Sequence, residues 1–243
     1  MKIGGFQKFS LLDYPGQLAA IVFAQGCNFR CPYCHNPQLV DPQRFGTLIR
    51  EADIFDFLLT RKGKLGAICI TGGEPCMQPE LIDFVRKLKE MDYLVKIDTN
   101  GSFPNLIENL IKADLVDYWA MDVKAPENLY SVISGNEIDT KDIQRSMDLL
   151  RGCGKDFEFR TTLFERLFNL HDLSMIQQML KPGDRYYLQQ CRYESNLEEL
   201  SPEDKFQVQL GEETYLNLLE HPACKHLMRW GDLHNVNINI RSL

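Results

Sequence analysis

Three of the eight cysteines in this 243-residue chain lie close enough in sequence to bind one metal centre. Cys27, Cys31 and Cys34 form a C-x3-C-x2-C pattern, and thiolates are soft ligands that suit zinc or an iron–sulfur cluster. A four-iron cluster commonly takes four cysteine ligands. With three, one iron keeps a coordination position for a small molecule. The other cysteines are scattered, which is typical of buried, unreactive thiols: Cys69, Cys76, Cys153, Cys191 and Cys224.

Two other interpretations of this cysteine loop stay open. His35 follows Cys34 and can complete a zinc site, although adjacent ligands on one tetrahedral ion are sterically awkward. The loop can also hold a structural, non-catalytic cluster. Tyr33 offers an aromatic face that either stacks on a nucleobase or covers the metal, and Arg30 supplies a charge that stabilises a reduced cluster.

The segments that must position this loop alternate between strand and helix patterns. Apolar residues recur at i, i+3 and i+4 spacing in 54–59, 81–88, 106–111, 143–150 and 173–180. Such alternation predicts βαβ units, and therefore a mostly parallel sheet with its helices outside. The fold expected is α/β, a partial (β/α)6 TIM-like barrel. The six predicted strands are Ala19–Ala24, Ala67–Ile70, Leu94–Asp98, Tyr118–Asp122, Phe157–Thr162 and Tyr186–Gln190.

A single domain is expected over residues 1–243, with its core at about 15–192. Residues 193–243 are expected to add a C-terminal helix and a candidate last strand. That strand is Asn237–Arg241, in which polar and apolar residues alternate.

Polar motifs follow the predicted strands rather than precede them. The cysteine loop follows the first strand and Thr71–Pro75 follows the second. Asp98–Gly101, Asp122–Lys124 and Gln189–Gln190 lie at the ends of the third, fourth and sixth strands. In barrels of this kind the chemistry gathers at the carboxyl ends of the strands. The sequence therefore predicts one site at that edge.

The composition excludes several classes of protein. Apolar residues make up 44% and charged residues 25% of the chain, so it is neither disordered nor fibrous. Lys and Arg number 27 against 34 Asp and Glu, a formal charge of −7 that supplies no broad basic face for nucleic acid. The longest apolar run, Leu18–Ala24, is too short to span a membrane. We expect a cytoplasmic protein, because the N-terminus lacks the apolar core of a signal peptide.

The cysteine loop resembles the signature of the radical S-adenosylmethionine (SAM) superfamily. Within that superfamily, residues 26–37 resemble the glycyl-radical-enzyme activases. An ordered set of further motifs, spread over about residues 1–190, resembles the anaerobic ribonucleoside-triphosphate reductase activating proteins. These motifs are Gly4–Gln7, Asp13–Gly16, Gly72–Pro75, Lys96–Gly101, Asp117–Tyr118, Ala120–Pro126, Phe157–Thr162 and Tyr186–Gln190.

The resemblance implies a reaction, its cofactors and its partners. A [4Fe–4S] cluster would bind SAM and pass one electron to its sulfonium, giving methionine and a 5′-deoxyadenosyl radical. That radical would take a hydrogen atom from a glycine of a glycyl-radical enzyme, an anaerobic ribonucleotide reductase or a relative. The electron would come from reduced flavodoxin or ferredoxin. Neither nucleic acid nor a membrane is expected as a partner.

The resemblance also assigns roles to individual residues. Cys27, Cys31 and Cys34 would be the catalytic residues that bind iron, and Gly72, Gly73 and Glu74 would contact the SAM ammonium. Lys124 would pair with the SAM carboxylate, and Gln190 would contact the adenine or ribose. Tyr33 and Asp98 complete the expected cofactor contacts. Asp98, Thr99 and Asp122 match positions that would line a site for a monovalent cation.

Two regions depart from the family pattern, and two rival functions stay open. Leu163–Leu170 lacks the expected turn residues and the last 50 residues match loosely, so partner recognition is expected in these parts. No second cysteine cluster is visible, which argues against activases with auxiliary clusters. One rival is a small-molecule radical SAM enzyme resembling the deazapurine synthases. The other is a non-catalytic iron–sulfur or zinc module.

Overall fold

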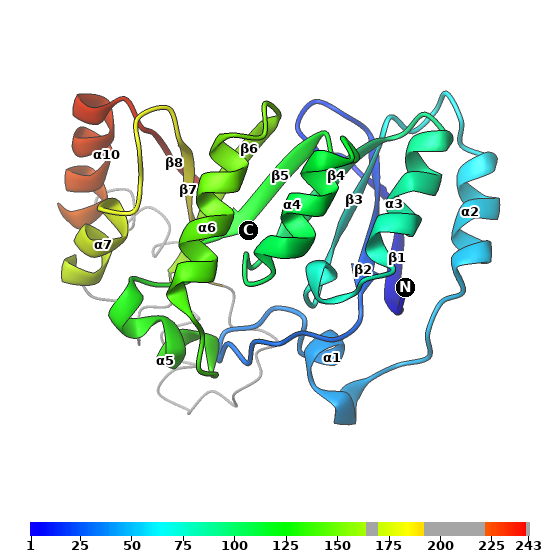
Figure 1. The fold of residues 1–243 in the computed structure, drawn as a ribbon, viewed down its shortest axis with the longest axis horizontal. Helices are drawn as coiled ribbons and strands as arrows, with labels where there is room; N and C mark the ends of the chain where they lie inside the picture. Colours follow the sequence, from blue (N-terminus) through cyan, green and yellow to red (C-terminus); the bar gives the residue numbers. More distant parts are fainter. Residues whose placement is uncertain (164–169, 192–221, 242–243) are drawn as a thin grey trace. The chain divides into compact units, whose positions relative to one another are not determined.

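The computed structural model describes residues 1–163, 170–191 and 222–241 (Figure 1). These residues fall into two compact units. The first unit contains residues 1–29, 36–121 and 141–157. The second contains residues 30–35, 122–140 and the described part of 158–243. The sequence expectation of a single domain over residues 1–243 stays a prediction.

Within each unit the strands follow one another in the sheet in chain order. In the first unit β1 pairs antiparallel with β2, whereas β2, β3, β4 and β5 pair in parallel. In the second unit β6, β7 and β8 are parallel. The strands are β1 Ile3–Ser10, β2 Ala19–Ala24, β3 Ala67–Gly72, β4 Leu94–Thr99, β5 Tyr118–Asp122, β6 Asp156–Leu163, β7 Arg185–Gln190 and β8 Asn237–Arg241.

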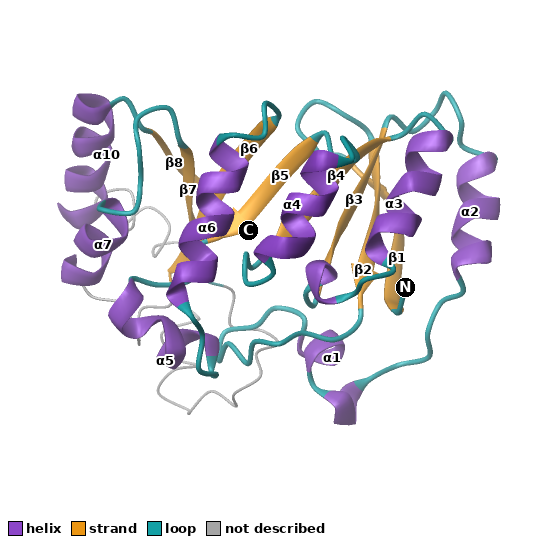
Figure 2. Ribbon diagram, in the orientation of Figure 1, coloured by secondary structure: helices purple, strands orange, loops and turns teal. Residues whose placement is uncertain are grey.

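Helices alternate with the strands, as Figure 2 shows. All five helical patterns of the sequence form helices, and α1 and α5 are short additional ones. The helices are α1 Pro37–Val40, α2 Glu51–Leu59, α3 Leu81–Glu90, α4 Pro104–Lys112, α5 Tyr130–Ser134, α6 Thr140–Arg151, α7 Leu170–Gln177 and α10 Pro222–His234. Three 3-10 turns, η1 Pro42–Arg44, η2 Pro75–Met77 and η3 Glu127–Leu129, link them.

Local sequence explains how α3 packs and why α4 begins where it does. In α3 the apolar residues Leu81, Phe84, Val85 and Leu88 share one buried face, which packs on β4. Helix α4 begins with Pro104, whose missing N–H is not needed in a first turn.

All six predicted strands and the predicted last strand, β8, are confirmed. Strand β1 was not predicted, because Gly4 and Gly5 weaken a strand pattern and Gln7 and Lys8 are exposed. It is an edge strand whose pairing with β2 decides its structure.

The parallel register places the ends of neighbouring strands at one edge. In the first unit Ala24 lies opposite Gly72, and Thr99 lies opposite Met121. The loops that follow β2, β3 and β4 therefore leave the sheet side by side. This arrangement brings the predicted motifs of the first unit together.

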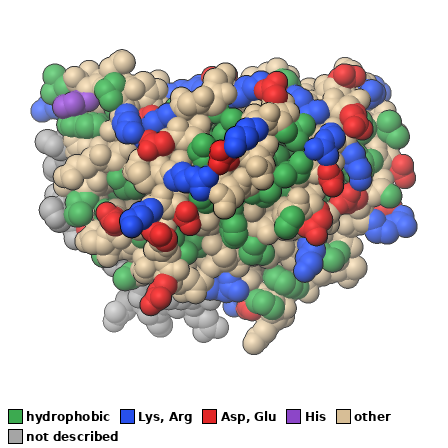
Figure 3. Space-filling view, viewed as in Figure 1, with side chains coloured by type: hydrophobic (Ala, Val, Ile, Leu, Met, Phe, Trp, Pro, Cys, Tyr) green, Lys and Arg blue, Asp and Glu red, His purple; other side chains and the backbone are tan. Residues whose placement is uncertain are grey.

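The described side chains on the face shown in Figure 3 mix basic and acidic groups without a patch of one sign. Among the ion pairs of the first unit, Arg86 pairs with Asp83, and Arg145 pairs with Glu108. Within the part of the chain that the structure describes, no helix combines the length and apolar character needed to cross a membrane.

Candidate functional site

The turn after β3 lies directly against the chain that leads into the cysteine loop. The N–H of Gly73 donates to the Ala24 carbonyl at 2.9 Å, and the N–H of Glu74 donates to the Gly26 carbonyl at 2.8 Å. Gly72 has a φ of +111°. A Cβ on Gly73 would overlap the Gly26 carbonyl oxygen. These glycines are therefore required by the close approach of two protein segments, which fixes the start of the cysteine loop.

The Glu74 carboxylate faces inward, where its oxygens are occupied by protein donors. It is 1% exposed. Its Oε1 accepts from the Cys76 N–H and the Thr99 hydroxyl, both at 2.8 Å, and its Oε2 accepts from the Asn100 N–H at 2.6 Å. Burial raises the pKa of Glu74 to about 7, although these donors favour the ionised form. The carboxylate thus joins the turn after β3 to the end of β4. Only the backbone of Gly72–Glu74 stays a proposed SAM contact.

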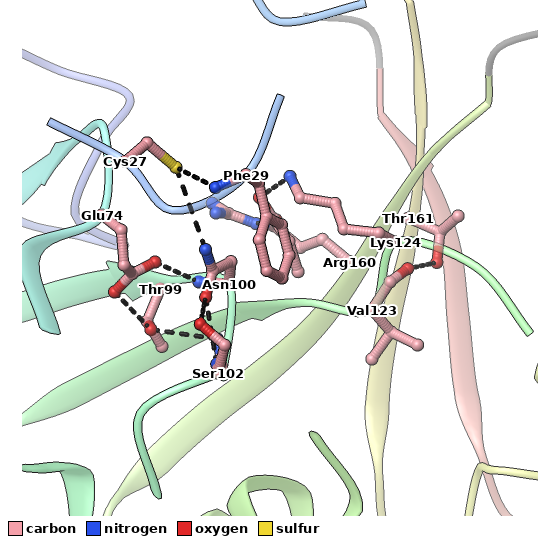
Figure 4. Close-up of polar contacts among 12 residues, drawn as sticks. Cys27, Phe29, Glu74, Thr99, Asn100, Ser102, Val123, Lys124, Arg160 and Thr161 are labelled. Carbon is pink, nitrogen blue, oxygen red and sulfur yellow. Dashed lines mark hydrogen bonds and ion pairs between the residues drawn. The ribbon is translucent and has the colours of Figure 1, made fainter. Parts of the chain in front are cut away.

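Cys27 is surrounded by hydrogen-bond donors of the first unit (Figure 4). Its sulfur accepts the Phe29 N–H at 3.3 Å, and Asn100 Nδ2 lies 4.0 Å away. The same Nδ2 donates to Asn28 Oδ1 at 3.0 Å, and Asn28 Nδ2 donates to Ser102 Oγ at 2.9 Å. N–H groups directed at sulfur suit a ligand thiolate. This donor environment fits an iron–sulfur cluster ligand.

Cys31 and Cys34 belong to the second unit, where the loop is braced against α5. The Arg30 N–H donates to the Ser134 carbonyl at 2.6 Å, and the Cys34 N–H donates to the Cys31 carbonyl at 3.0 Å. Burial raises the pKa of the Cys31 thiol to about 11, while the nearby ammonium of Lys124 works in the opposite direction. A metal ion would have to displace this proton.

Tyr33 and Tyr130 line the same part of the second unit, and both are buried. Burial raises the pKa of each phenol, so both are neutral at physiological pH. The Tyr130 hydroxyl accepts the Lys124 backbone N–H at 3.2 Å, which fixes the chain directly after β5.

Lys124 is part of an ion-pair network after β5. Asp122 Oδ2 accepts from Lys124 Nζ and Asp122 Oδ1 accepts from Arg160 Nε, both at 2.8 Å. Burial disfavours the charged form of Asp122, but Arg160 and Lys124 hold the pKa of this carboxyl below its usual value. Burial likewise disfavours charged Lys124, but Asp122 keeps its pKa above the usual value. Lys124 is therefore a fixed cation, as pairing with a carboxylate requires. Figure 4 shows this lysine and Arg160.

The three predicted cation ligands all have protein partners. Asp98 pairs with Lys96 in the first unit, whereas Asp122 has the two cations described above. The Thr99 hydroxyl donates to Glu74. Lys96 begins the quoted motif Lys96–Gly101, but no role was predicted for its side chain. It is 4% exposed, and its Nζ lies 3.8 Å from Cys69 Sγ. Its place within an apolar strand pattern was the signal in the sequence, because a lysine at a buried strand position needs a partner.

Over residues 1–163, 170–191 and 222–241, no three His, Cys, Asp or Glu side chains are gathered closely enough to form a metal site as they stand. His35, the residue considered for zinc, has its Nε2 3.9 Å from Cys191 Sγ. The cluster, zinc and cation ligands stay predictions from the sequence. Gln190 ends β7, and its side chain lies outside the described part of the structure, as does most of Leu163–Leu170.

The comparison with protein families decides the identity of the chain. Residues 21–169, more than half of the sequence, match the model of the radical SAM superfamily. The chain belongs to this superfamily. Members of the radical SAM superfamily use a [4Fe–4S] cluster and SAM, so these two predicted cofactors and the enzymatic character are confirmed.

Three relatives show which members of the radical SAM superfamily this chain is similar to. A Methanocaldococcus jannaschii protein, provisionally named a glycyl-radical enzyme activating enzyme, is 37% identical over 195 residues, 77% of this chain and 79% of that protein. A pyruvate formate-lyase-activating enzyme of Clostridium pasteurianum is 35% identical over 55% of this chain and 57% of its own length. A 7-carboxy-7-deazaguanine synthase of Methanothermobacter thermautotrophicus is 32% identical over 56% of this chain and 53% of its own length.

A solved structure shows the same fold. Native anSMEcpe with bound AdoMet has a TM-score of 0.63 at 15% identity, over 90% of this chain and 61% of that chain. The predicted α/β fold with a mostly parallel sheet is thereby confirmed, and the likeness agrees with the predicted partial barrel. This chain spans less than two thirds of anSMEcpe and just over half of the second and third relatives.

Proposed function

We propose that this radical SAM enzyme activates a glycyl-radical enzyme by removing a hydrogen atom from a glycine of its partner. The observation that carries the proposal is the 37% identity to the Methanocaldococcus jannaschii relative, over more than three quarters of both chains. The similarity to a pyruvate formate-lyase-activating enzyme supports the same class of reaction. The motifs quoted from the sequence favour an anaerobic ribonucleotide reductase, or a relative of it, as the partner.

The residues of this chain have separable tasks in the proposed reaction. When bound, the reduced cluster supplies the electron that cleaves SAM, and Cys27, Cys31 and Cys34 would hold it. The fixed ammonium of Lys124 would bind the SAM carboxylate, with Asp122 and Arg160 keeping it charged and in place. The backbone of Gly72–Glu74 would receive the SAM ammonium.

Two further assignments concern the surroundings of the reaction. Buried Tyr33 would exclude water from the cysteine loop, which protects a reactive radical. Gln190 would bind the adenosine part of SAM, because an amide can both donate and accept. Asp98, Thr99 and Asp122 would accept a monovalent cation only if Lys96, Lys124 and Arg160 gave up their carboxylate contacts. Reduced flavodoxin or ferredoxin is the proposed electron donor. The cytoplasm is the proposed location of the reaction.

The experiment begins with anaerobic reconstitution of the chain with iron and sulfide, followed by dithionite and SAM. Formation of 5′-deoxyadenosine is then measured by chromatography. An anaerobic ribonucleotide reductase and a pyruvate formate-lyase are added separately, and electron paramagnetic resonance records the glycyl radical. The matched control is each partner with its radical glycine replaced by alanine. We expect a glycyl signal with the reductase and none with the control.

A second candidate function is a small-molecule reaction, which the similarity to a 7-carboxy-7-deazaguanine synthase favours. Here a purine-like compound, rather than a protein, would accelerate SAM cleavage. Acceleration by such a compound, together with no glycyl signal from either partner, would replace the activase proposal. Zinc without iron or sulfide after anaerobic purification would contradict both functions.

A further inference from the structure

A ring of three polar side chains lies beside Cys27 in the first unit. Asn28 Nδ2 donates to Ser102 Oγ at 2.9 Å, and Ser102 Oγ donates to Asn100 Oδ1 at 2.6 Å. Asn100 Nδ2 closes the ring by donating to Asn28 Oδ1 at 3.0 Å. The same Nδ2 lies 4.0 Å from Cys27 Sγ. The ring therefore joins the residue after Cys27 to the loop after β4, and Figure 4 shows Asn100 and Ser102 of that loop.

The ring fixes which end of the Asn100 amide faces the sulfur. Its Oδ1 accepts both the N–H of Ser102, at 3.0 Å, and the Ser102 hydroxyl. An amide oxygen has two lone pairs, so this end is fully used. The NH2 end, with two donors, must point toward Asn28 and Cys27.

The loop that carries Asn100 is itself held on several sides. The Asn100 N–H donates to Glu74, and the Gly101 carbonyl accepts the buried Ser146 hydroxyl of α6 at 2.6 Å. Gly101 has a φ of +77°, and a Cβ there would overlap the Met121 side chain. Asn100 is 6% exposed. A donor fixed in this way costs little reorganisation when charge on the sulfur changes.

We propose that Asn100 is a positioning residue for Cys27 and that its side-chain N–H raises the reduction potential of the cluster. Hydrogen bonds to ligand sulfurs stabilise the reduced cluster, because reduction increases the negative charge on sulfur. The Phe29 N–H reaches the same sulfur at 3.3 Å, so a backbone donor and a side-chain donor both approach Cys27. The inference requires Cys27 to be a cluster ligand, but it does not depend on the identity of the partner.

The experiment compares two variants by anaerobic redox titration of the reconstituted cluster, followed by electron paramagnetic resonance. Asn100→Asp keeps the shape and the acceptor for Ser102 but replaces the NH2 group with oxygen. Asn109→Asp makes the same chemical change at an exposed position of α4. Iron content and melting temperature are measured for both. Ser102→Ala, which removes a hydroxyl that orients the Asn100 amide, is the second test.

We expect Asn100→Asp to shift the cluster potential in the negative direction, Ser102→Ala to shift it less, and Asn109→Asp to leave it at the parent value. Loss of iron from Asn100→Asp also supports the proposal if the variant melts like the parent without iron and Asn109→Asp is fully loaded, since Cys27 then needs the amide to hold iron. The proposal is overturned if both ring variants load fully and keep the parent potential, or if the parent binds no cluster. A missing glycyl radical alone would count against the proposed function and leave this inference standing.

Discussion

The three cysteines of the loop have different surroundings, although all three are predicted to bind iron. Cys31 is buried with a raised thiol pKa, whereas Cys27 and Cys34 are partly exposed. Because each would supply one of only three anchors, we expect Cys27→Ala, Cys31→Ala and Cys34→Ala to reduce 5′-deoxyadenosine formation to the level without iron.

The matched control for these variants is Cys69→Ala, which removes a fully buried thiol on β3. It should retain SAM cleavage and lower the free energy of unfolding by ~1 kcal/mol. Iron analysis, product chromatography and denaturant unfolding measure the three quantities. Equal loss of cleavage in all four variants, with each still folded, would refute the ligand assignment.

Glu74 gives a prediction about pH. Its pKa of about 7 lies above the ordinary value of 4.5, so the folded chain binds this proton more tightly than the unfolded chain. The contribution of protonated Glu74 to the free energy of unfolding is complete below about pH 4.5 and is lost as the pH rises through about 7. In Glu74→Gln this pH-dependent loss is absent. Its NH2 group would face existing donors, which should lower the free energy of unfolding by about 1–3 kcal/mol at any pH.

Thermal unfolding between pH 4.5 and 8 tests this reasoning. The difference in melting temperature between the parent and Glu74→Gln should shrink as the pH rises. Glu80→Gln, at an exposed position, is the control and should follow the parent at every pH. A difference that grows with pH would show that the Glu74 carboxylate is ionised and stabilising.

At the scale of elements, the contact between the turn after β3 and the end of β2 can be tested by one methyl group. In Gly73→Ala the new Cβ would overlap the Gly26 carbonyl oxygen, so the turn must move away from residues 24–26. Such overpacking should destabilise the chain by about 1–3 kcal/mol. Because the displaced segment leads into Cys27, iron content should fall as well.

Gly46→Ala is the control for this variant, since a Cβ there has no neighbour within 4 Å. Its stability in urea and its iron content should equal those of the parent. A Gly73→Ala variant with parent stability and full iron content would mean that the close approach of the two segments has no role in holding the loop.

Six strands could be predicted because each carries a short apolar run next to a helical repeat, and β8 could be predicted because its polar and apolar residues alternate. Strand β1 could not, because its residues show no alternation and its structure comes from pairing with β2. The same limit applies to the site. The position of Glu74 after β3 was predictable, but its inward orientation depends on donors 25 and 26 residues further along the chain. The ring of Asn28, Asn100 and Ser102 likewise depends on pairs more than 70 residues apart.

Lys96 shows a limit of carrying residue roles over from a family resemblance. The resemblance assigned Asp98 to a cation site. The lysine two residues earlier lies on the same side of β4 and pairs with it. A lysine two positions away in a strand therefore competes with a metal cation for the carboxylate of its neighbour.

At the scale of the whole molecule, the predicted cluster should act as a folding ligand. A group that binds the folded chain and not the unfolded one stabilises the folded state by mass action, by about 2.7 kcal/mol when its concentration is 100 times the dissociation constant. In a chain of this size that corresponds to roughly 5–10 °C in melting temperature. We expect an increase of this order after anaerobic reconstitution, and its loss after iron chelation.

The increase should also depend on the predicted ligands. Cys31→Ala should melt at the same temperature with and without iron and sulfide, whereas Cys69→Ala should show the full increase from a slightly lower starting value. Differential scanning calorimetry in an anaerobic cell measures both. If Cys31→Ala gained as much as the parent, iron would be stabilising the chain through other residues, and the cluster would have to be assigned elsewhere.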